Sequence, residues 1–370
     1  MKNRLFLIIA TAACLGSFTA CSQDNDIVVP DGDLKAAISF NVNIGQTPEP
    51  EVSMRGYAAN TDGSTYTFTS GQKVALAVSG VSNGRTPVGE TNQETKLYTV
   101  GTGTGSQALT YASGGTSAYE FDWKSQSEVI SVRAWSNGTS STTADDPSNT
   151  IFTVDKDQSG AETKDVKELL YSPAIRHSYS SINVPLFHQM SRIVVNAKGT
   201  LSKKTPTDLT TITIDGIYIG SSNDIDVPGP IKNSGKFSRP SNDSYNNAWT
   251  YTNYQVGKSY DSSTNISDAD KYGSWEELSG AVNIKCKTES LTSGYTATAS
   301  AIIIPATYAN ATKFITIDPS NGIYNFSLGS SITFEPGKQY TFNITNLNEI
   351  KLNVTVTAWK ADANQSLTLE

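Results

Sequence analysis

Several segments of the chain alternate apolar and polar side chains with a period of two residues. The clearest covers residues 38–44, where polar residues separate four apolar ones: Ile38, Phe40, Val42 and Ile44. This period is typical of a β-strand with one buried face. Similar runs predict strands at residues 67–79, 128–135, 192–197, 211–219, 297–304, 314–317, 340–344 and 352–358. Glycine, proline, asparagine and aspartate lie between the runs, which indicates short strands joined by turns.

Helical patterns are few. Residues 163–170 have the composition of two helical turns, and residues 275–278 that of one. Many short strands between turn signals predict an all-β fold built of β-sandwiches. Because one long sandwich would expose its edges, we expect two tandem domains, at residues 36–185 and 186–370. The polar residues 221–273 are expected to form a surface excursion of the second domain.

Composition and charge agree with this fold class and exclude one class of partner. Charged residues make up 17% of the 370 residues, which is low for long helices, and the net charge is −7 at pH 7. An acidic chain without basic clusters repels phosphates. We therefore expect no binding to nucleic acid.

The N-terminus has the features of a secretory signal. Two basic residues precede an apolar stretch too short to span a bilayer. The stretch ends in Phe18-Thr19-Ala20-Cys21, which resembles a lipoprotein cleavage motif, with a cysteine thiol to accept the lipid. We predict a signal peptide at residues 1–20, acylation of Cys21 and an acidic tether at residues 21–35. Acylation of Cys14, or an ordinary secretory peptide, remains an alternative.

Cysteine usage excludes a disulfide framework in the mature chain. If Cys21 carries lipid and Cys14 is removed with the signal peptide, Cys286 has no cysteine left to pair with. Cys286 alternates with Val282 and Ile284, so it is expected to be a buried small apolar side chain rather than a nucleophile.

The sequence shows no pattern typical of a catalytic, cofactor or metal site. His177 has polar neighbours and is expected to lie in a loop. Neither His177 nor His188 has a partner at the spacing of zinc ligands, and no Gly-x-Ser-x-Gly motif marks a nucleophile. A Ser-His-Asp triad has members far apart in sequence, so a hydrolase on a sandwich scaffold stays open as a weaker hypothesis. We expect no enzyme activity, no cofactor and no metal.

Tryptophans offer an alternative kind of site. Four of them are candidates for stacking on sugar rings, although aromatic residues are more often part of a sandwich core: Trp123, Trp135, Trp249 and Trp275. This alternative predicts that they line one exposed face.

A protease-sensitive segment follows the first predicted strand. Prolines in residues 47–51 disfavour helix and strand pairing alike, so the segment that reaches Arg55 and Gly56 is expected to be an exposed loop. A trypsin-like cut after Arg55 would separate residues 38–44 covalently from the rest. Loss of that strand would open an apolar groove flanked by unpaired backbone groups, a template for a strand from another subunit. The alternative is that Arg55 is simply a soluble loop residue.

These features together resemble the fimbrillin family, the type V pilins of Bacteroidales. The resemblance rests on the lipoprotein start, the strand at 38–44, the Met54-Arg55-Gly56 that follows, and four later motifs. These motifs lie at residues 186–195, 302–307, 334–340 and 354–359.

The resemblance implies more than the residue patterns do. Members are exported as outer-membrane lipoproteins at the cell surface and have two transthyretin-like β-sandwich domains. An arginine-specific protease removes the leading strand, and a neighbouring subunit fills the gap. Carried over, Arg55 and Gly56 match the cleavage position and residues 38–44 the displaced strand. Only residues 362–370 follow the last predicted strand, so a stalk, tip or anchor role stays open.

Two functions from different classes follow. The preferred hypothesis is a structural subunit of a cell-surface fimbria, anchored in outer-membrane lipid through acylated Cys21 and assembled with other fimbrial subunits by strand exchange. The alternative is a monomeric, lipid-anchored surface protein that binds carbohydrate.

Overall fold

A computed structural model describes most of the chain after residue 35. The described residues are 36–44, 57–59, 66–80, 94–103, 106–112, 121–123, 128–160, 167–179, 181–198, 200–202, 209–211, 214–243, 249–250, 268–319, 323–345, 354–358 and 367–369. The predicted signal peptide at 1–20, the tether at 21–35, Cys21, Arg55 and Gly56 all lie outside these residues.

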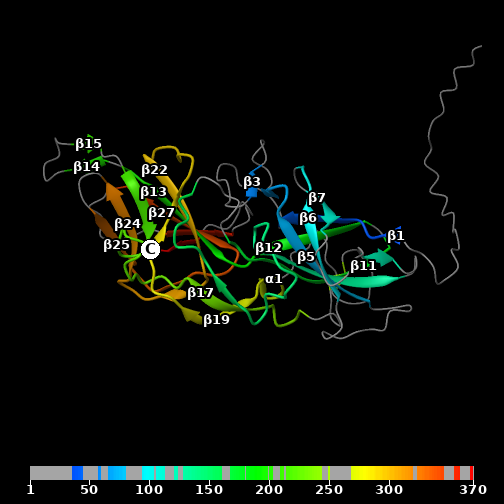
Figure 1. The fold of residues 1–370 in the computed structure, drawn as a ribbon. Helices are drawn as coiled ribbons and strands as arrows, with labels where there is room; N and C mark the ends of the chain where they lie inside the picture. The colour runs from blue at the N-terminus through cyan, green and yellow to red at the C-terminus, as the bar shows by residue number, and fades with distance from the viewer. Residues whose placement is uncertain are drawn as a thin grey trace, which may run out of the picture.

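The described residues are almost entirely β-strand. They contain 29 strands and one short helix, α1 (Asp268–Lys271). The strands gather into two lobes placed end to end (Figure 1). The predicted all-β fold with two tandem β-sandwiches is confirmed.

The N-terminal sandwich is a continuous ladder of strands. In spatial order the strands are β12 (Ile182–His188), β2 (Phe40–Ile44), β7 (Gln107–Tyr111), β6 (Glu94–Val100), β5 (Lys73–Gly80), β9 (Val129–Ser136) and β11 (Leu170–Ser178). β11 then pairs back onto β12 through two residue pairs, so the two faces close into a ring. β18 (Trp249–Thr250) lies parallel to β11 on its outer side. Two small antiparallel strand pairs complete this lobe: β1 (Ala36–Ala37) with β8 (Asp122–Trp123), and β3 (Tyr57–Ala59) with β4 (Tyr66–Phe68).

The C-terminal sandwich has two separate sheets. One contains, in order, β21 (Lys287–Thr288), β22 (Ala297–Ile303), β13 (Ser191–Ala197), β27 (Lys338–Ile344), β28 (Val354–Ala358) and β29 (Leu367–Leu369). The other contains β20 (Ile284–Lys285), β16 (Ile214–Ile219), β24 (Lys313–Pro319) and β25 (Tyr324–Ser327). Two short pairs lie beside them: β14 (Thr200–Ser202) with β15 (Leu209–Thr211), and β23 (Thr307–Tyr308) with β26 (Ile332–Thr333).

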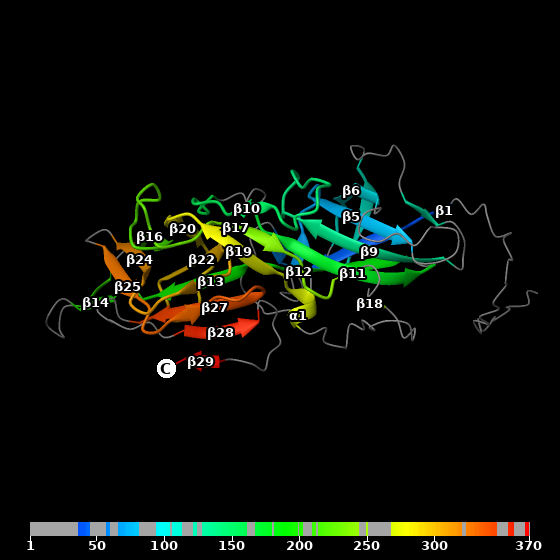
Figure 2. The ribbon, with the colours of Figure 1, turned by 90° about the horizontal axis from the view of Figure 1, so that it is seen from below.

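A three-stranded sheet joins the two lobes. β10 (Ile151–Thr153) comes from the first half of the chain, and β17 (Ser234–Ser238) and β19 (Ser274–Ser279) come from the second. Figure 2 shows the three strands side by side between the lobes. Leu278 of β19 packs against both hydrophobic cores, so this sheet couples the two sandwiches.

The helical prediction at residues 275–278 is wrong, and so is the one at residues 163–170 as far as the structure describes it, because residues 163–166 lie outside the described residues. Residues 167–169 have no regular structure, and Leu170 begins strand β11. Residues 275–278 lie within strand β19. A β-bulge in this strand gives Trp275 and Leu278 a spacing that also occurs on one face of a helix. Three residues of β19 oppose two of β17 there, and Glu277 has a φ of 49°.

The chain passes between the sandwiches through two residues. β12 ends at His188 and β13 begins at Ser191, so Gln189 and Met190 form the connection. The predicted boundary between residues 185 and 186 falls inside β12. Because the whole of β12 pairs within the N-terminal ladder, we place the boundary at the two connecting residues.

The polar excursion at residues 221–273 contributes to the interior, contrary to prediction. Its Phe237 is fully buried in the N-terminal core, and Asp243 is buried against the same lobe. Arg133 donates to both carboxylate oxygens of Asp243, at 3.0 Å from Nε and 3.1 Å from Nη2. Tyr171 also donates to this carboxylate, at 2.7 Å. A charged anchor therefore fixes the excursion to strands β9 and β11.

Candidate functional site

The first long strand of the described chain, β2, lies between two other strands of the N-terminal ladder. It runs parallel to β12, with five residue pairs from Phe40↔Ile182 to Ile44↔Leu186. On its other side it is antiparallel to β7, through Asn41↔Ala108 and Val42↔Gln107. The strand predicted at residues 38–44 is therefore an internal strand from Phe40 onward.

The neighbour β12 pairs with β2 over five residue pairs and with β11 over only two. Ile182 donates its backbone N–H to Ser39 O at 2.8 Å. Since alternate residues of a strand direct their backbone groups to the same side, Val184 and Leu186 also face β2, and Pro185 faces β11. Proline has no N–H to donate, and the β11–β12 pairing is limited to residues 187 and 188 of β12. Departure of β2 would make β12 an edge strand over most of its length.

The opposite neighbour, β7, is held by a buried glutamine. Gln107 is 2% exposed, and its side chain accepts from Phe68 N at 2.7 Å and donates to Phe68 O at 2.9 Å. It also donates to Gly101 O at 3.1 Å. Ser106, at the start of β7, donates to Asn183 Oδ1 of β12 at 2.9 Å. The two strands that flank β2 are thus tied to their surroundings, and to each other, independently of β2.

The inward side chains of β2 belong to the hydrophobic core. The residue just before β2 at position 38 and the three inward side chains of β2 are almost completely buried, with exposed fractions of 3%, 1%, 0% and 5%: Ile38, Phe40, Val42 and Ile44. The intervening residues are exposed or half-buried, and Asn41 donates to the Ser181 hydroxyl at 3.1 Å. Burial of each apolar side chain contributes roughly 1.5–3 kcal/mol. Removal of this strand would expose an apolar surface in the middle of the sandwich.

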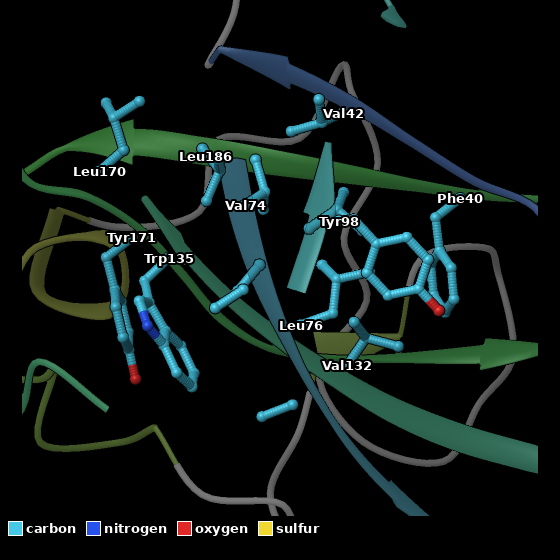
Figure 3. Close-up of a cluster of buried hydrophobic side chains, with 14 of the residues drawn as sticks. Phe40, Val42, Val74, Leu76, Tyr98, Val132, Trp135, Leu170, Tyr171 and Leu186 are labelled. Carbon is cyan, nitrogen blue, oxygen red and sulfur yellow. The ribbon is translucent and has the colours of Figure 1, made fainter. Parts of the chain in front are cut away.

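Phe40 lies in an aromatic pocket. Its ring meets Tyr98 edge-on at a centroid distance of 5.4 Å and Phe121 at 6.2 Å. Tyr98 and Phe121 are stacked at 6.3 Å, and Lys96 Nζ lies 4.4 Å from the Phe121 centroid. Figure 3 shows the Phe40 and Tyr98 rings against each other, with Val42 and Leu186 further along the same core. We call Tyr98, Phe121 and Lys96 the Phe40 pocket.

The residues before β2 extend the same contact. Ile38 donates its N–H to Phe121 O at 2.8 Å, and β1 pairs with β8 through Ala36↔Trp123. The strand therefore covers the backbone of the Phe40 pocket as well as its rings.

The two histidines are buried rather than placed in an open site. His177 lies in strand β11, not in the polar loop that the sequence suggested, and burial lowers its pKa to about 3. His188 is the last residue of β12, and its Nδ1 contacts Oε1 of the buried Glu168. Their side chains are 3% and 0% exposed, so a substrate has no access to this pair. Among the described residues no group of three or more histidine, cysteine, aspartate or glutamate side chains suits a metal ion.

The described tryptophan rings are core residues and do not form an exposed face. Trp123 and Trp135 are 2% and 3% exposed. Trp275 is half-buried against Phe152 and Phe237, and its indole N–H donates to Gln189 O at 2.8 Å. The side chain of Trp249 lies outside the described residues. The aromatic platform that a sugar site requires is absent from the three rings described.

Two further findings concern the Cys286 thiol and membrane-spanning helices. Cys286 is buried in the C-terminal core, as predicted for a small apolar side chain. No helix of the described part of the chain is long and apolar enough to cross a membrane.

The sequence indicated β2 but not its surroundings. Tyr98, Phe121, Gln107 and Pro185 come from segments far from residues 38–44, and a single sequence contains no signal that pairs them with β2. The alternation within residues 94–100 was the one available hint that Tyr98 faces the core.

Comparison with known protein families shows to which family the chain belongs. The sequence profile of fimbrillin-like proteins matches residues 58–359. The chain belongs to the fimbrillin-like family. Membership supports a role as a fimbrial subunit at the cell surface that assembles with other fimbrial subunits. A search of curated protein sequences gives no match.

Solved structures resemble this fimbrillin-like protein over most of its length. A protein of Bacteroides uniformis with a proposed role in cell adhesion is 13% identical, with a TM-score of 0.48, and the match covers 88% of this chain and 98% of the other. A fimbrial assembly protein of Parabacteroides distasonis is 10% identical over 91% and 99%, with a TM-score of 0.41. The C-terminally truncated tip fimbrial protein Mfa3 of Porphyromonas gingivalis is 11% identical over 87% and 99%, with a TM-score of 0.37.

Proposed function

We propose that this fimbrillin-like protein is a structural, non-enzymatic fimbrial subunit that joins a neighbour by strand exchange after proteolysis between Arg55 and Gly56. The observation that carries the proposal is the position of β2. It is the first long strand, its three inward side chains and Ile38 just before it are buried, and both of its neighbours are held by other contacts. The strand is a separable part of the core.

The order of the chain makes one cut sufficient. Residues 45–56 connect β2 to β3, and everything that flanks β2 in the ladder comes later in the sequence. A single break at Arg55 therefore leaves β2 held only by noncovalent contacts. A strand from a neighbouring subunit that supplies the same inward side chains and backbone groups can replace it.

Export and anchoring form the other half of the proposal. Signal peptidase would remove residues 1–20, and acylated Cys21 would hold the precursor in the outer membrane. Because Cys21 precedes β2, cleavage at Arg55 also separates the anchor from the subunit. Release from lipid and opening of the groove are then one event, carried out by an arginine-specific protease.

The proposal is tested on protein extracted from the cell surface. N-terminal sequencing of assembled material is expected to show Gly56 as the first residue, and electron microscopy is expected to show filaments that contain the protein. An Arg55→Ala variant should accumulate as the lipid-linked precursor. Assembled filaments whose subunits retain residues 21–55 would contradict strand exchange at this site.

The carbohydrate-binding alternative has no comparable support. It depends on exposed tryptophans, and Trp123 and Trp135 are buried.

A further inference from the structure

A strand in the β2 position could pair with β12 in more than one register. The side chains of a strand alternate with a period of two, so a slip of two residues keeps every apolar side chain inward. Backbone hydrogen bonds to β12 are equally well made after such a slip. Ile38, Val42 and Ile44 are aliphatic and of similar size, so their sites distinguish poorly between neighbouring registers.

The site of Phe40 is different from the other three. It is formed by two aromatic rings, and Phe40 meets both of them edge-on, with interplanar angles of 66° and 71°. A slip of two residues would place an aliphatic side chain here and leave a cavity. It would also force the phenylalanine ring into an aliphatic site such as that of Val42, which is 0% exposed. Cavities and overpacking are both destabilising, so the slipped registers are disfavoured twice.

We propose that the Phe40 pocket is an aromatic-specific subsite that fixes the register of whichever strand occupies the β2 position. This inference rests on the proposed function and goes beyond it by stating the chemistry of the partner. The partner strand carries one inward aromatic side chain with aliphatic side chains two positions before and after it. Polar residues occupy the outward positions, as Asn41 and Asn43 do in β2.

The same reasoning excludes one partner. Residues 366–369 of this chain alternate as Ser366-Leu367-Thr368-Leu369 and offer only leucine to an inward face. The C-terminal segment of a second copy therefore does not match the Phe40 pocket. The partner strand is therefore a segment other than residues 366–369.

The test uses the chain with residues 49–54 replaced by the recognition sequence of a site-specific protease. After cutting, the freed segment is removed in mild denaturant, and circular dichroism checks that the β-structure is recovered. A labelled peptide of residues 36–46 is then added, and fluorescence anisotropy measures its binding. The wild-type peptide and an Asn41→Ala peptide, which is changed only at an outward position, are expected to bind alike.

The matched control is a peptide with Phe40→Val and Val42→Phe together. It has the same composition and the same alternation, and only the position of the aromatic side chain differs. We expect its affinity to fall at least about tenfold, and a peptide of residues 362–370 to bind at least about tenfold more weakly than the wild type. Equal binding of the exchanged peptide, or tight binding of residues 362–370, would overturn the inference and leave strand exchange intact.

Failure of the proposed function gives a different result. If the refolded, stripped protein does not bind the wild-type peptide, the groove is not a strand acceptor at all. A second measurement on the uncut chain covers the case in which the stripped protein aggregates. There the double exchange Phe40→Val/Val42→Phe should lower the melting temperature, whereas Asn41→Ala should leave it nearly unchanged. An unchanged melting temperature for the double exchange would also overturn the inference.

Discussion

Arg133 and Asp243 form a bidentate ion pair in which neither side chain is exposed, although 110 positions separate them in the sequence. Arg133 lies on β9 of the N-terminal ladder, and Asp243 belongs to the excursion that leads out of and back to the second sandwich. The pair fastens the second half of the chain to the first.

Loss of Asp243 should be costly. An Asp243→Ala variant leaves the Arg133 guanidinium buried without its carboxylate, and such a loss typically destabilises by about 3–5 kcal/mol. Urea denaturation of the variant measures it. Glu277→Ala is the matched control, because its partner Lys236 and Glu277 itself are both partly exposed, and such pairs contribute roughly 0–1 kcal/mol. Equal stabilities of the two variants would show that the buried pair contributes nothing special.

The uncut chain should be far more sensitive to change at Phe40 than at Asn41. Truncation of a buried phenylalanine to alanine costs about 3–5 kcal/mol, whereas Asn41 faces outward and makes one exposed hydrogen bond. We expect Phe40→Ala to lower the urea midpoint strongly and Asn41→Ala to leave it nearly unchanged. A small effect of Phe40→Ala would mean that β2 is not part of the stabilising core.

Stability should fall with acidity because of His177. Burial lowers its pKa from 6.5 to about 3, so between these values the unfolded chain binds a proton that the folded chain does not. The folding stability that depends on a neutral His177 is fully present above pH 6.5, and about 2 kcal/mol of it is lost by pH 5. Denaturation at pH 7.5 and pH 5 should therefore show a smaller difference for His177→Phe than for the wild type. Identical pH dependence of the two proteins would contradict this account.

The Gln189 side chain should stabilise the segment that contains α1 against local unfolding. Its side chain donates to Lys271 O at 3.1 Å and accepts from Gly273 N at 2.9 Å, both buried. Gln189→Ala leaves these groups unpaired, at about 1–3 kcal/mol each. We expect faster amide hydrogen exchange across residues 268–273, with little change for Gln339→Ala on β27. Unchanged exchange rates would show that other contacts hold this segment.

The alternation of residues 38–44 was enough to predict both the first strand and its buried face. Short-range patterns of this kind report on one strand and its two sides. They carry no information on which strand lies next to it, so the parallel pairing with β12 and the aromatic pocket around Phe40 were not predictable. Partners of a strand are set by long-range packing, which a single sequence does not record.

The wrong predictions have identifiable physical causes. Trp275 and Leu278 share a face because of a bulge, which reproduces helical spacing within a strand. The excursion was expected to stay on the surface because it is polar, yet Asp243 is buried through its pairing with Arg133. The histidine at position 177 was assigned to a loop from its polar neighbours, which line a strand instead.

The direct passage from β12 to β13 has a mechanical consequence. Whatever strand fills the β2 position is hydrogen-bonded along β12, and β12 continues through Gln189 and Met190 into a central strand of the second sandwich. Part of any tension applied to the occupant passes along this covalent path, and part passes into β7, which flanks the same position. A subunit bound at that position would then pull on the second sandwich through peptide bonds as well as through the contacts between the two lobes.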